Sequence, residues 1–401
     1  MNKVYLAVRM GLFAVILTLG TLAALVVDEA RGLALADLSG APVRVMATAG
    51  QGEAMVAALA GGPQAPGIYR SDDNGSTWQW MGAGPAAEIK ALAAHPADRN
   101  VMVAGSAGGP SREAKPLWHS FDGGQTWLAA PLGLPVSPDG MMPDVTALAA
   151  DARQPNSVYV GTDGQGVYRY DMRADRYGYE LIGGLALRDA HVRSLVVGGD
   201  GRLYALTNDG LHVVASDGDA WQRLDVPEMP ASLAVAPDDP QVLYAGGVST
   251  GMYRSSDGGQ SWEQVNSGLT LNPGVALRVT ALAVDAADPK HVAAAMAFGV
   301  GNKFAPDGVY DSRDGGYSWT RLAKTNGLVT QLTFEQGVIY AATEQGMVRY
   351  GEPAQSPSAI AMPRLRSLTN PSGVQALILA LTVVLAALAL VGRAEWVLRQ
   401  S

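Results

Sequence analysis

The chain has 401 residues, no cysteine, 48 glycines and a formal net charge of −8, with only 16% charged residues. The missing cysteines exclude a disulfide scaffold and any cysteine-ligated zinc or iron–sulfur site, and the acidic balance argues against a nucleic-acid partner. Hydrophobic residues make up 48% of the chain, which is too many for a disordered protein.

The first element expected along the chain is a membrane-spanning helix over residues 10–27. This run contains no charged residue, follows Lys3 and Arg9, and is long enough to cross a hydrocarbon core of about 30 Å. It exceeds the roughly 7–15 apolar residues at the centre of a signal peptide. We therefore expect a transmembrane helix or signal anchor after a cytoplasmic tail at 1–9. A cleaved signal peptide is the alternative.

The middle of the chain repeats one eight-residue motif, Ser-x-Asp-x-Gly-x-Ser/Thr-Trp, four times. The Asp carboxylate of such a motif accepts hydrogen bonds from nearby backbone N–H groups, the Gly adopts a positive φ, and the Trp packs beneath the turn. The motif therefore predicts a structural turn, and we assign its Asp residues no catalytic role. The structural residues of the four copies are Ser71, Asp73, Gly75, Trp78, Ser120, Asp122, Gly124, Trp127, Ser255, Asp257, Gly259, Trp262, Ser312, Asp314, Gly316 and Trp319.

Short apolar runs, separated by Gly, Pro and Asp, flank each motif, so each repeat predicts four strands, named a to d. The repeat length of about 40–57 residues suits a four-stranded propeller blade of roughly 40–50. The seventh unit ends at Tyr350 after three strands, and residues 32–38 are expected to supply its outer strand. The seven a strands are expected to begin near Arg44, Ile89, Val145, Val192, Ala231, Val279 and Val329.

The predicted fold is all-β, a seven-bladed β-propeller at 32–350 with four-stranded antiparallel blades and one transmembrane helix at each end. A linker at 351–371 leads to the second predicted helix at 372–392, and a cytoplasmic tail follows at 393–401.

Lysine and arginine beside the two apolar runs decide the predicted orientation in the membrane. Basic residues near a span favour the cytoplasmic side. The protein is therefore expected to lie in the cell membrane as a two-pass protein, with its propeller on the extracytoplasmic side. The residues that carry this prediction are Lys3, Arg9, Arg393 and Arg399.

The four motif copies resemble the Asp-box, or BNR, repeat of β-propeller proteins, and the resemblance covers roughly residues 40–350. Sialidases, sortilin-like receptors, some glycosidases and the photosystem II stability/assembly factors share that repeat. In blade count, and in lacking an obvious catalytic set, the chain is similar to the last family, whose members are non-enzymatic propellers. The resemblance thus implies a propeller that acts by binding.

The sequence lacks the residue set that sialidases with this repeat use. The resemblance implies an early Phe/Tyr-Arg-Ile-Pro segment for a sialidase, and that segment is absent. The five histidines have no metal-ligand spacing, and His95 and His291 are expected to be solvated turn residues. We predict no catalytic residue, no metal and no cofactor. Four loop carboxylates leave a glycosidase open, namely Asp144, Asp163, Asp189 and Glu228.

Long loops of unequal length fall on one face of the predicted propeller, at 105–116, 131–143, 266–277 and 299–307. Such loops usually carry function, and Met and aromatic residues are enriched in protein interfaces. Trp118 and Phe304 have the alternative role of capping their own blades. The candidate partner-binding residues in or beside the loops are Trp118, Met141, Met142, Leu271 and Phe304.

A second candidate binding feature lies in the a strands. Three basic residues, Arg44, Lys90 and Arg193, each stand two residues before a recurrent Leu or Met, and are expected near one mouth of the channel. We expect them to face an acidic partner or an anionic ligand. The alternative is that they are solvated channel residues.

These patterns predict a non-enzymatic, membrane-anchored propeller that scaffolds, assembles or stabilises a membrane protein complex through its loop-rich face. The expected partners are subunits of that complex and the lipid bilayer, contacted through two helices. A receptor for a carbohydrate or peptide ligand is the alternative, and a degenerate glycosidase is the third possibility.

Overall fold

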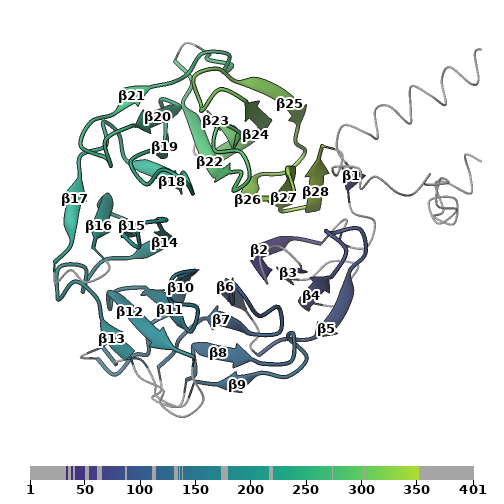
Figure 1. The fold of residues 1–401 in the computed structure, drawn as a ribbon, viewed down its shortest axis with the longest axis vertical. Helices are drawn as coiled ribbons and strands as arrows, with labels where there is room; N and C mark the ends of the chain where they lie inside the picture. The colour runs from purple at the N-terminus through teal and green to yellow at the C-terminus, as the bar shows by residue number, and fades with distance from the viewer. Residues whose placement is uncertain are drawn as a thin grey trace, which may run out of the picture. The chain divides into compact units, whose positions relative to one another are not determined.

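A computed structural model describes residues 33–351 with short internal gaps. These residues form seven four-stranded antiparallel sheets, which surround a central channel as the blades of a propeller (Figure 1). This arrangement confirms the predicted all-β, seven-bladed fold. The gaps are at 35–37, 39–40, 50–53, 61–65, 86–87, 111–113, 131–133, 135, 138, 173–178, 216–219, 273 and 302.

In the first three blades the strands follow one another in chain order from the channel to the rim. Blade 1 contains β2 (Val43–Ala49), β3 (Ala54–Leu59), β4 (Gly67–Ser71) and β5 (Gln79–Gly82). Blade 2 contains β6 (Ile89–Ala94), β7 (Met102–Ser106), β8 (Leu117–Ser120) and β9 (Leu128–Ala129). Blade 3 contains β10 (Val145–Ala150), β11 (Ser157–Thr162), β12 (Val167–Asp171) and β13 (Tyr179–Leu181).

The next three blades have the same order, and the seventh takes its outer strand from the start of the described chain. Blade 4 contains β14 (Val192–Val197), β15 (Leu203–Thr207), β16 (Leu211–Val214) and β17 (Gln222–Leu224). Blade 5 contains β18 (Pro230–Val235), β19 (Leu243–Gly247), β20 (Met252–Ser255) and β21 (Glu263–Gln264). Blade 6 contains β22 (Leu277–Val284), β23 (Val292–Val300), β24 (Lys303–Ser312) and β25 (Thr320–Lys324). Blade 7 contains β26 (Val329–Glu335), β27 (Val338–Thr343), β28 (Gly346–Tyr350) and β1 (Leu33–Ala34).

The hydrophobic core lies between neighbouring blades rather than at the centre of the ring. Because each blade is covered on both faces, the b strands β11, β15, β19 and β27 are buried along their whole length. Small side chains allow the sheets to approach closely. Ala293 and Ala295 of blade 6 share one buried cluster with Leu332 and Ile339 of blade 7.

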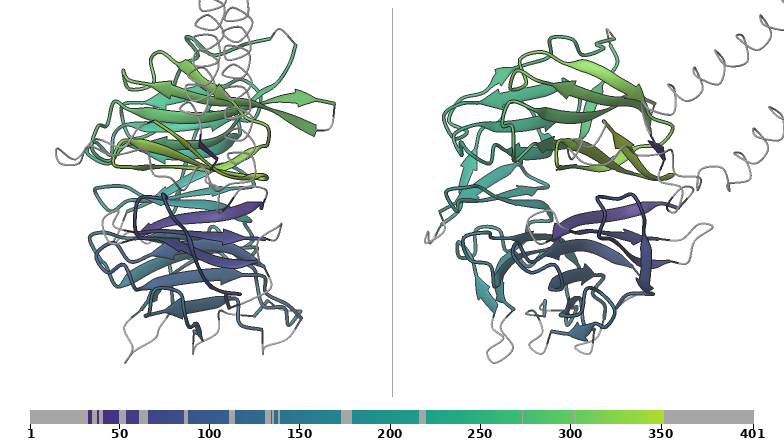
Figure 2. Two further views of the ribbon diagram at one scale, coloured as in Figure 1. Left: turned by 90° about the vertical axis from the view of Figure 1, so that its right-hand side faces the viewer. Right: turned by 45° about the vertical axis from the view of Figure 1, so that its right-hand side comes forward.

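The antiparallel order gives the ring two different faces. The a–b turns and the c–d turns lie on one side, which we name the turn face, and the b–c and d–a connections lie on the other, the loop face (Figure 2). The four sequence motifs occupy c–d turns and are named the motif turns.

All four motif turns have the same hydrogen bonds. The first Ser hydroxyl accepts the Gly N–H at 2.8–2.9 Å, and the Asp carboxylate accepts the N–H and the hydroxyl of the Thr or Ser four residues later. The motif glycines have positive φ values, from 70° at Gly75 to 94° at Gly124. Each turn is therefore closed by its own side chains.

The ring closes without a covalent link, through blade 7. In β1, Leu33 pairs with Arg349 and Ala34 with Val348, so the chain's first described strand completes the last blade. The predicted outer strand from residues 32–38 is confirmed for these two residues. Across the same junction, Gln331 bonds both the N–H and the C=O of Met46, at 2.8 and 2.9 Å.

Two expectations from the sequence need comment. The predicted loop at 299–307 is mostly a β-hairpin, because β-forming residues extend the ladder, with Phe298 opposite Ala305 and Gly299 opposite Phe304. The predicted spans at 10–27 and 372–392 lie outside the described residues. Within the described part of the chain, no helix is long and apolar enough to cross a membrane.

Candidate functional site

The channel is lined by one repeated irregularity of the a strands. Each a strand has a β-bulge at the same position, so one residue of the strand is not paired in the ladder. A bulge also increases the local twist of the strand and redirects the side chain there. These residues line a central cavity of about 370 Å³. We name them the bulge ring, and they are Arg44, Lys90, Thr146, Arg193, Ala231, Thr280 and Thr330.

Several polar side chains of the channel connect one blade to the next. Lys90 reaches the Asp144 carboxylate of the following blade at 2.5 Å. Thr146 donates to the Val192 carbonyl of its neighbour at 2.5 Å. Arg193 donates to the Pro230 carbonyl of the next blade at 3.0 Å, and twice to Thr207 of its own blade. Residues of the bulge ring therefore form hydrogen bonds and an ion pair between neighbouring blades as well as lining the channel.

The three basic residues predicted at the channel mouth all belong to the bulge ring, but their charges differ in surroundings. Lys90 is neutralised by Asp144. Burial alone would raise the pKa of the Asp144 carboxyl, but hydrogen bonds from Lys90 and the Gly108 N–H bring that pKa below its usual value. Arg44 is exposed and has no side-chain partner among the described residues.

Arg193 carries a positive charge that no described carboxylate neutralises, since its hydrogen-bond acceptors are carbonyls. Burial, and secondly the positive charge of Arg278, lowers the pKa of the Arg193 guanidinium. Arg278 lies at the loop-face end of β22, 4.9 Å above the ring of Phe304. At the mouth of the channel, the charge of Lys90 in blade 2 is therefore neutralised by Asp144 at the start of blade 3. The positive charges of Arg193 in blade 4 and Arg278 in blade 6 are not neutralised by a described carboxylate.

Exposed apolar side chains gather on the loop face. Of the exposed large apolar residues in the described part of the chain, Trp80 and Leu128 lie on outer strands, and Phe121 and Tyr317 lie in motif turns. All the others belong to d–a or b–c connections of the loop face, or to the tip of the β23–β24 hairpin. They are Met141, Leu185, Met229, Leu271, Val275 and Val300.

The structure places the residues predicted for partner binding in two settings. Met141 and Leu271 are exposed, at 40% and 53%, whereas Met142, which follows Met141, is buried at 4%. Trp118 is half-buried in β8 against the core between blades 1 and 2. Phe304 lies half-buried under Arg278 in the blade 6 hairpin.

Sequence reasoning missed Met229 and Arg278 at the same face. Each stands two residues before a bulge-ring position, Ala231 and Thr280, in the same tier as Asp144. A search of the same position in every repeat, two residues before the bulge-ring residue, would have found them. Leu185 and Val300 carry no such signal, since they lie in connections of irregular length.

Four loop carboxylates were named above as possible glycosidase residues. Where the structure describes their contacts, these carboxylates bind neighbouring side chains or backbone groups of the propeller itself. Glu228 accepts the N–H of Thr250 at 3.0 Å and its hydroxyl at 2.5 Å. Asp163 forms an ion pair with His191. Among the described residues, no group of three or more acidic or histidine side chains is arranged to hold a metal ion.

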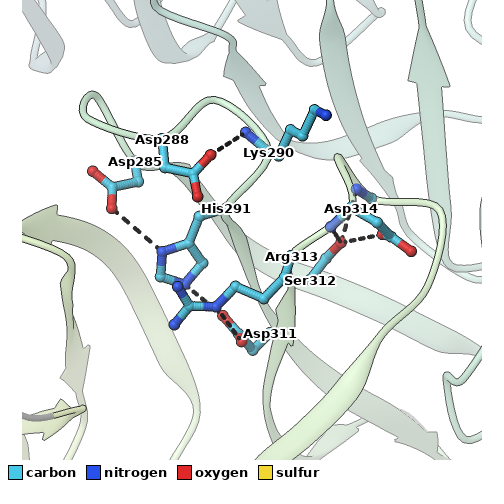
Figure 3. Close-up of polar contacts among 9 residues, drawn as sticks. Asp285, Asp288, Lys290, His291, Asp311, Ser312, Arg313 and Asp314 are labelled. Carbon is cyan, nitrogen blue, oxygen red and sulfur yellow. Dashed lines mark hydrogen bonds and ion pairs between the residues drawn. The ribbon is translucent and has the colours of Figure 1, made fainter.

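A buried histidine cluster lies on the turn side of blade 6 (Figure 3). His291 is 1% exposed, with Nε2 2.6 Å from Asp311 and Nδ1 3.3 Å from Asp285. The expectation of a solvated turn residue is therefore wrong for His291, because blade 7 covers it, with Phe334 against the ring at 4.4 Å. His95 does act as a turn residue, and its Nδ1 accepts the Ala97 and Asp98 N–H groups.

The carboxylates of this cluster differ in their positively charged neighbours. Arg313 pairs with Asp311 at 3.1 Å. Burial alone would raise the pKa of Asp311, but the contacts with His291 and Arg313 lower it. Beside Asp285, burial and the neighbouring carboxylate raise the pKa of Glu335 to about 7. His291, Asp285 and Glu335 are buried at the junction of blades 6 and 7, whereas the Arg313 side chain is exposed. We therefore expect the buried part of the cluster to affect stability.

Comparisons with known proteins identify the fold but no family. No family model matches the chain, and no curated protein matches it. Among solved structures, YCF48 bound to a D1 peptide is 18% identical, with a TM-score of 0.57 over 81% of this chain and 96% of that chain. YCF48 from Cyanidioschyzon merolae is 14% identical, with a TM-score of 0.55 over 80% and 98%.

Glycosidases with the same fold are similar over part of their length. The GH74 xyloglucanase from Xanthomonas campestris is 16% identical, with a TM-score of 0.59 over 81% of this chain but only 54% of the enzyme. An ancestral GH74 enzyme is covered over 45% of its length. This chain thus spans about half of each glycosidase and nearly the whole of YCF48. Identities this low establish the propeller fold alone.

Proposed function

We propose that this protein is a non-enzymatic propeller that binds an extramembrane segment of a membrane protein complex on its loop face, and so scaffolds, assembles or stabilises that complex. The observation that carries the proposal is the concentration of exposed apolar side chains on that one face, at Met141, Leu185, Met229, Leu271 and Val300. Exposed apolar side chains that gather on one face, beside polar groups, favour a protein interface there.

The channel mouth supplies the polar part of the proposed interface. Arg193 and Arg278 lack a neutralising carboxylate among the described residues, and the exposed Met229 belongs to blade 5, which lies between their blades. A partner segment with an acidic group flanked by apolar side chains complements this arrangement. The existence of a YCF48 structure with a bound D1 peptide is consistent with peptide binding by a propeller of this size.

Affinity capture from membranes solubilised in mild detergent tests the proposal. Wild-type protein is expected to recover defined membrane subunits, and Leu271→Glu is expected to reduce their recovery at least fivefold. Phe121→Glu is the matched control, because Phe121 has similar exposure, 42% against 53%, but lies on the turn face. Both variants replace an exposed apolar side chain, so both are expected to keep the melting temperature of the wild type.

Three outcomes contradict the proposal. An equal loss of recovered membrane subunits in both variants would mean that the interface does not lie on the loop face. Recovery of the protein alone, with binding of glycans on an array, favours the receptor for a carbohydrate. Hydrolysis of a polysaccharide that is abolished by Asp144→Asn or Glu228→Gln establishes a glycosidase.

A further inference from the structure

The hairpin of β23 and β24 in blade 6 is longer than its counterparts. Strand β24 has ten residues, whereas the c strands of the other six blades have four or five. Its pairing with the outer strand β25 begins only at Gly308, opposite Lys324. Figure 2 (left) shows the hairpin as green strands that project from the ring. Among the described residues, 303–307 of β24 therefore have no strand on their outer side, and we name them the β24 edge.

Blades 2 to 5 leave no such edge in their described residues. In these blades the outer strand, or the residue directly after it, reaches the first residue of the c strand. Three of these contacts are backbone hydrogen bonds and one is a strand pair: Ala130 to Leu117, Ile182 to Val167, Val265 to Met252, and Leu224 opposite Leu211. The β24 edge is therefore an extension of blade 6 rather than a consequence of the repeat.

One N–H and two carbonyls of the β24 edge point outward. Gly299 lies opposite Phe304, and the Gly299 N–H donates to the Ala276 carbonyl on the inner side of the blade at 2.8 Å. Gly299 and Phe304 are therefore a pair without mutual hydrogen bonds, and both direct their N–H and C=O groups away from each other. Pro306 lies two residues further along β24, so its carbonyl points the same way, and it has no N–H. The edge thus offers one donor and two acceptors to a further strand.

The side chains around the β24 edge are positively charged. Lys303 at its start and Lys324 beside its end are exposed, and Arg278 lies 4.9 Å above the aromatic ring of the edge. The acidic residue of the edge, Asp307, is buried and paired with Arg321 at 3.0 Å. The exposed charge beside this free edge is therefore cationic, which complements an acidic segment.

We propose that the β24 edge binds one extended, acidic segment of the partner protein, which joins blade 6 as a further strand. This inference rests on the proposed function, because it names how the partner contacts the loop face. The backbone of the segment accepts the Phe304 N–H and donates to the carbonyls of Phe304 and Pro306, which gives three hydrogen bonds. Strand addition of this kind takes its affinity from main-chain bonds and its specificity from side chains. Acidic side chains of the segment lie beside Lys303 and Arg278.

A second copy of the chain fits the β24 edge less well than such a segment. Two of these edges together contain two outward donors and four outward acceptors, so they can form at most two hydrogen bonds with each other. A strand of another sequence forms three hydrogen bonds with a single edge. Lysine and proline at a strand edge also disfavour edge-to-edge pairing of copies, and the edge contains Lys303 and Pro306.

Peptide binding to full-length protein in mild detergent tests the proposal. The probes are two fluorescein-labelled decapeptides, one of alternating valine and glutamate and one of alternating valine and lysine. Fluorescence anisotropy is expected to show at least tenfold tighter binding of the glutamate peptide to the wild type. Lys303→Glu is expected to reduce that preference at least threefold, because it reverses the charge at the start of the edge.

A matched pair of variants isolates the outward N–H. Phe304→Pro removes this donor without breaking a hydrogen bond within the hairpin, whereas Phe304→Val keeps it. Both variants lose the aromatic ring and its contact with Arg278. The glutamate peptide is therefore expected to bind Phe304→Pro at least fivefold more weakly than Phe304→Val. Melting temperatures within 3 °C of each other control for folding of the two variants.

Hydrogen exchange of the wild type gives a second measurement that needs no variant. The Phe304 amide is expected to exchange at least tenfold more slowly when the glutamate peptide is saturating. Unchanged exchange at Phe304, or equal binding of the two peptides, overturns the proposal. Slow exchange without peptide that strengthens with protein concentration also overturns it, because a second copy then occupies the edge.

The strand proposal and the proposed function can fail separately. If wild-type protein recovers membrane subunits, and Phe304→Pro recovers as much of them as Phe304→Val, the partner does not add to the β24 edge and the proposed function stands. If the glutamate peptide slows exchange at Phe304 but no membrane subunit is recovered, the edge binds acidic strands and the proposed function is wrong.

Discussion

At the scale of single residues, the same motif slot holds tryptophans in different environments. Trp319 is 4% exposed, and its indole N–H donates to the Val265 carbonyl of the neighbouring blade at 2.9 Å. Trp262 is only half-buried and donates within its own turn, to Gly259 at 3.2 Å. The indole hydrogen bond of Trp319 therefore joins two blades, whereas that of Trp262 stays within one turn, although the Trp262 ring packs against the cluster between blades 4 and 5.

Removal of these two side chains is expected to have unequal effects on stability. Trp319→Ala should lower the free energy of unfolding by about 3–5 kcal/mol, because it leaves a cavity between blades. Trp262→Ala should cost roughly half as much, because much of its surface is already in contact with solvent. Denaturant titration of both variants checks the order, and a larger loss for Trp262→Ala would contradict the assignment of blade-to-blade packing.

Glu335 is expected to make the protein less stable as pH rises. Its pKa is about 7 in the folded protein and 4.5 in the unfolded chain, so its contribution is fully present below pH 4.5 and lost as pH rises through 7. Glu335→Gln cannot ionise and should therefore raise the melting temperature at pH 8 by several degrees, with a smaller difference at pH 5. A melting-temperature difference that is the same at both pH values would show that Glu335 does not ionise in this range.

The motif aspartates have the opposite dependence. Hydrogen bonds from the hydroxyl and N–H of Ser261 lower the pKa of Asp257 to about 2, so the ionised form is favoured in the fold. The stability that this adds is present above pH 3.8 and lost as pH falls toward 2. Glu335 and Asp257 together thus stabilise the fold most between about pH 3.8 and pH 7.

At the scale of elements, the β-bulge of each a strand decides what the channel contains. The bulge leaves one residue per blade out of the ladder. The side chains at these seven positions differ in their hydrogen-bond partners from blade to blade. Arg193 bonds carbonyls of two blades, while Arg44 has no such partner among the described residues. Two arginines in equivalent positions therefore have different roles.

Substitution of these two arginines separates the roles. Arg193→Met should lower the free energy of unfolding by about 1–3 kcal/mol, because the carbonyls of the buried residues Thr207 and Pro230 lose their hydrogen-bond donors. Arg44→Met should change it by less than about 0.5 kcal/mol, because Arg44 is exposed and forms none of these hydrogen bonds among the described residues. Denaturation curves for the pair check this, and equal losses would show that the inter-blade bonds of Arg193 add nothing.

At the scale of the whole molecule, the ring is closed only by pairing and packing, since the chain has no cysteine. Two residue pairs, between β1 and β28, complete blade 7. The junction also contains the bonds of Gln331 with Met46 and a bond from Tyr340 to the Asn74 carbonyl at 2.5 Å. The closure is thus shared between a short strand and the face of blade 1.

Breaking the strand pairing tests how much of this closure β1 provides. The double variant Leu33→Pro/Ala34→Pro removes both backbone donors of β1 and is expected to lower the melting temperature by several degrees. The control Leu33→Ala/Ala34→Ser keeps both donors. Scanning calorimetry of the two variants isolates the backbone contribution, and identical melting temperatures would show that the other contacts close the ring alone.

The sequence by itself determined the blade count, the strand order and the motif turns, because period-two runs and a repeated turn motif depend on local chemistry that each repeat encodes. It also located the basic tier at Arg44, Lys90 and Arg193. Only the tertiary structure decided which of these charges stays unneutralised, because Asp144 reaches Lys90 from 54 residues away. The burial of His291 likewise required blade 7 to pack over it, which is a contact between strands and not a property of the turn that contains it.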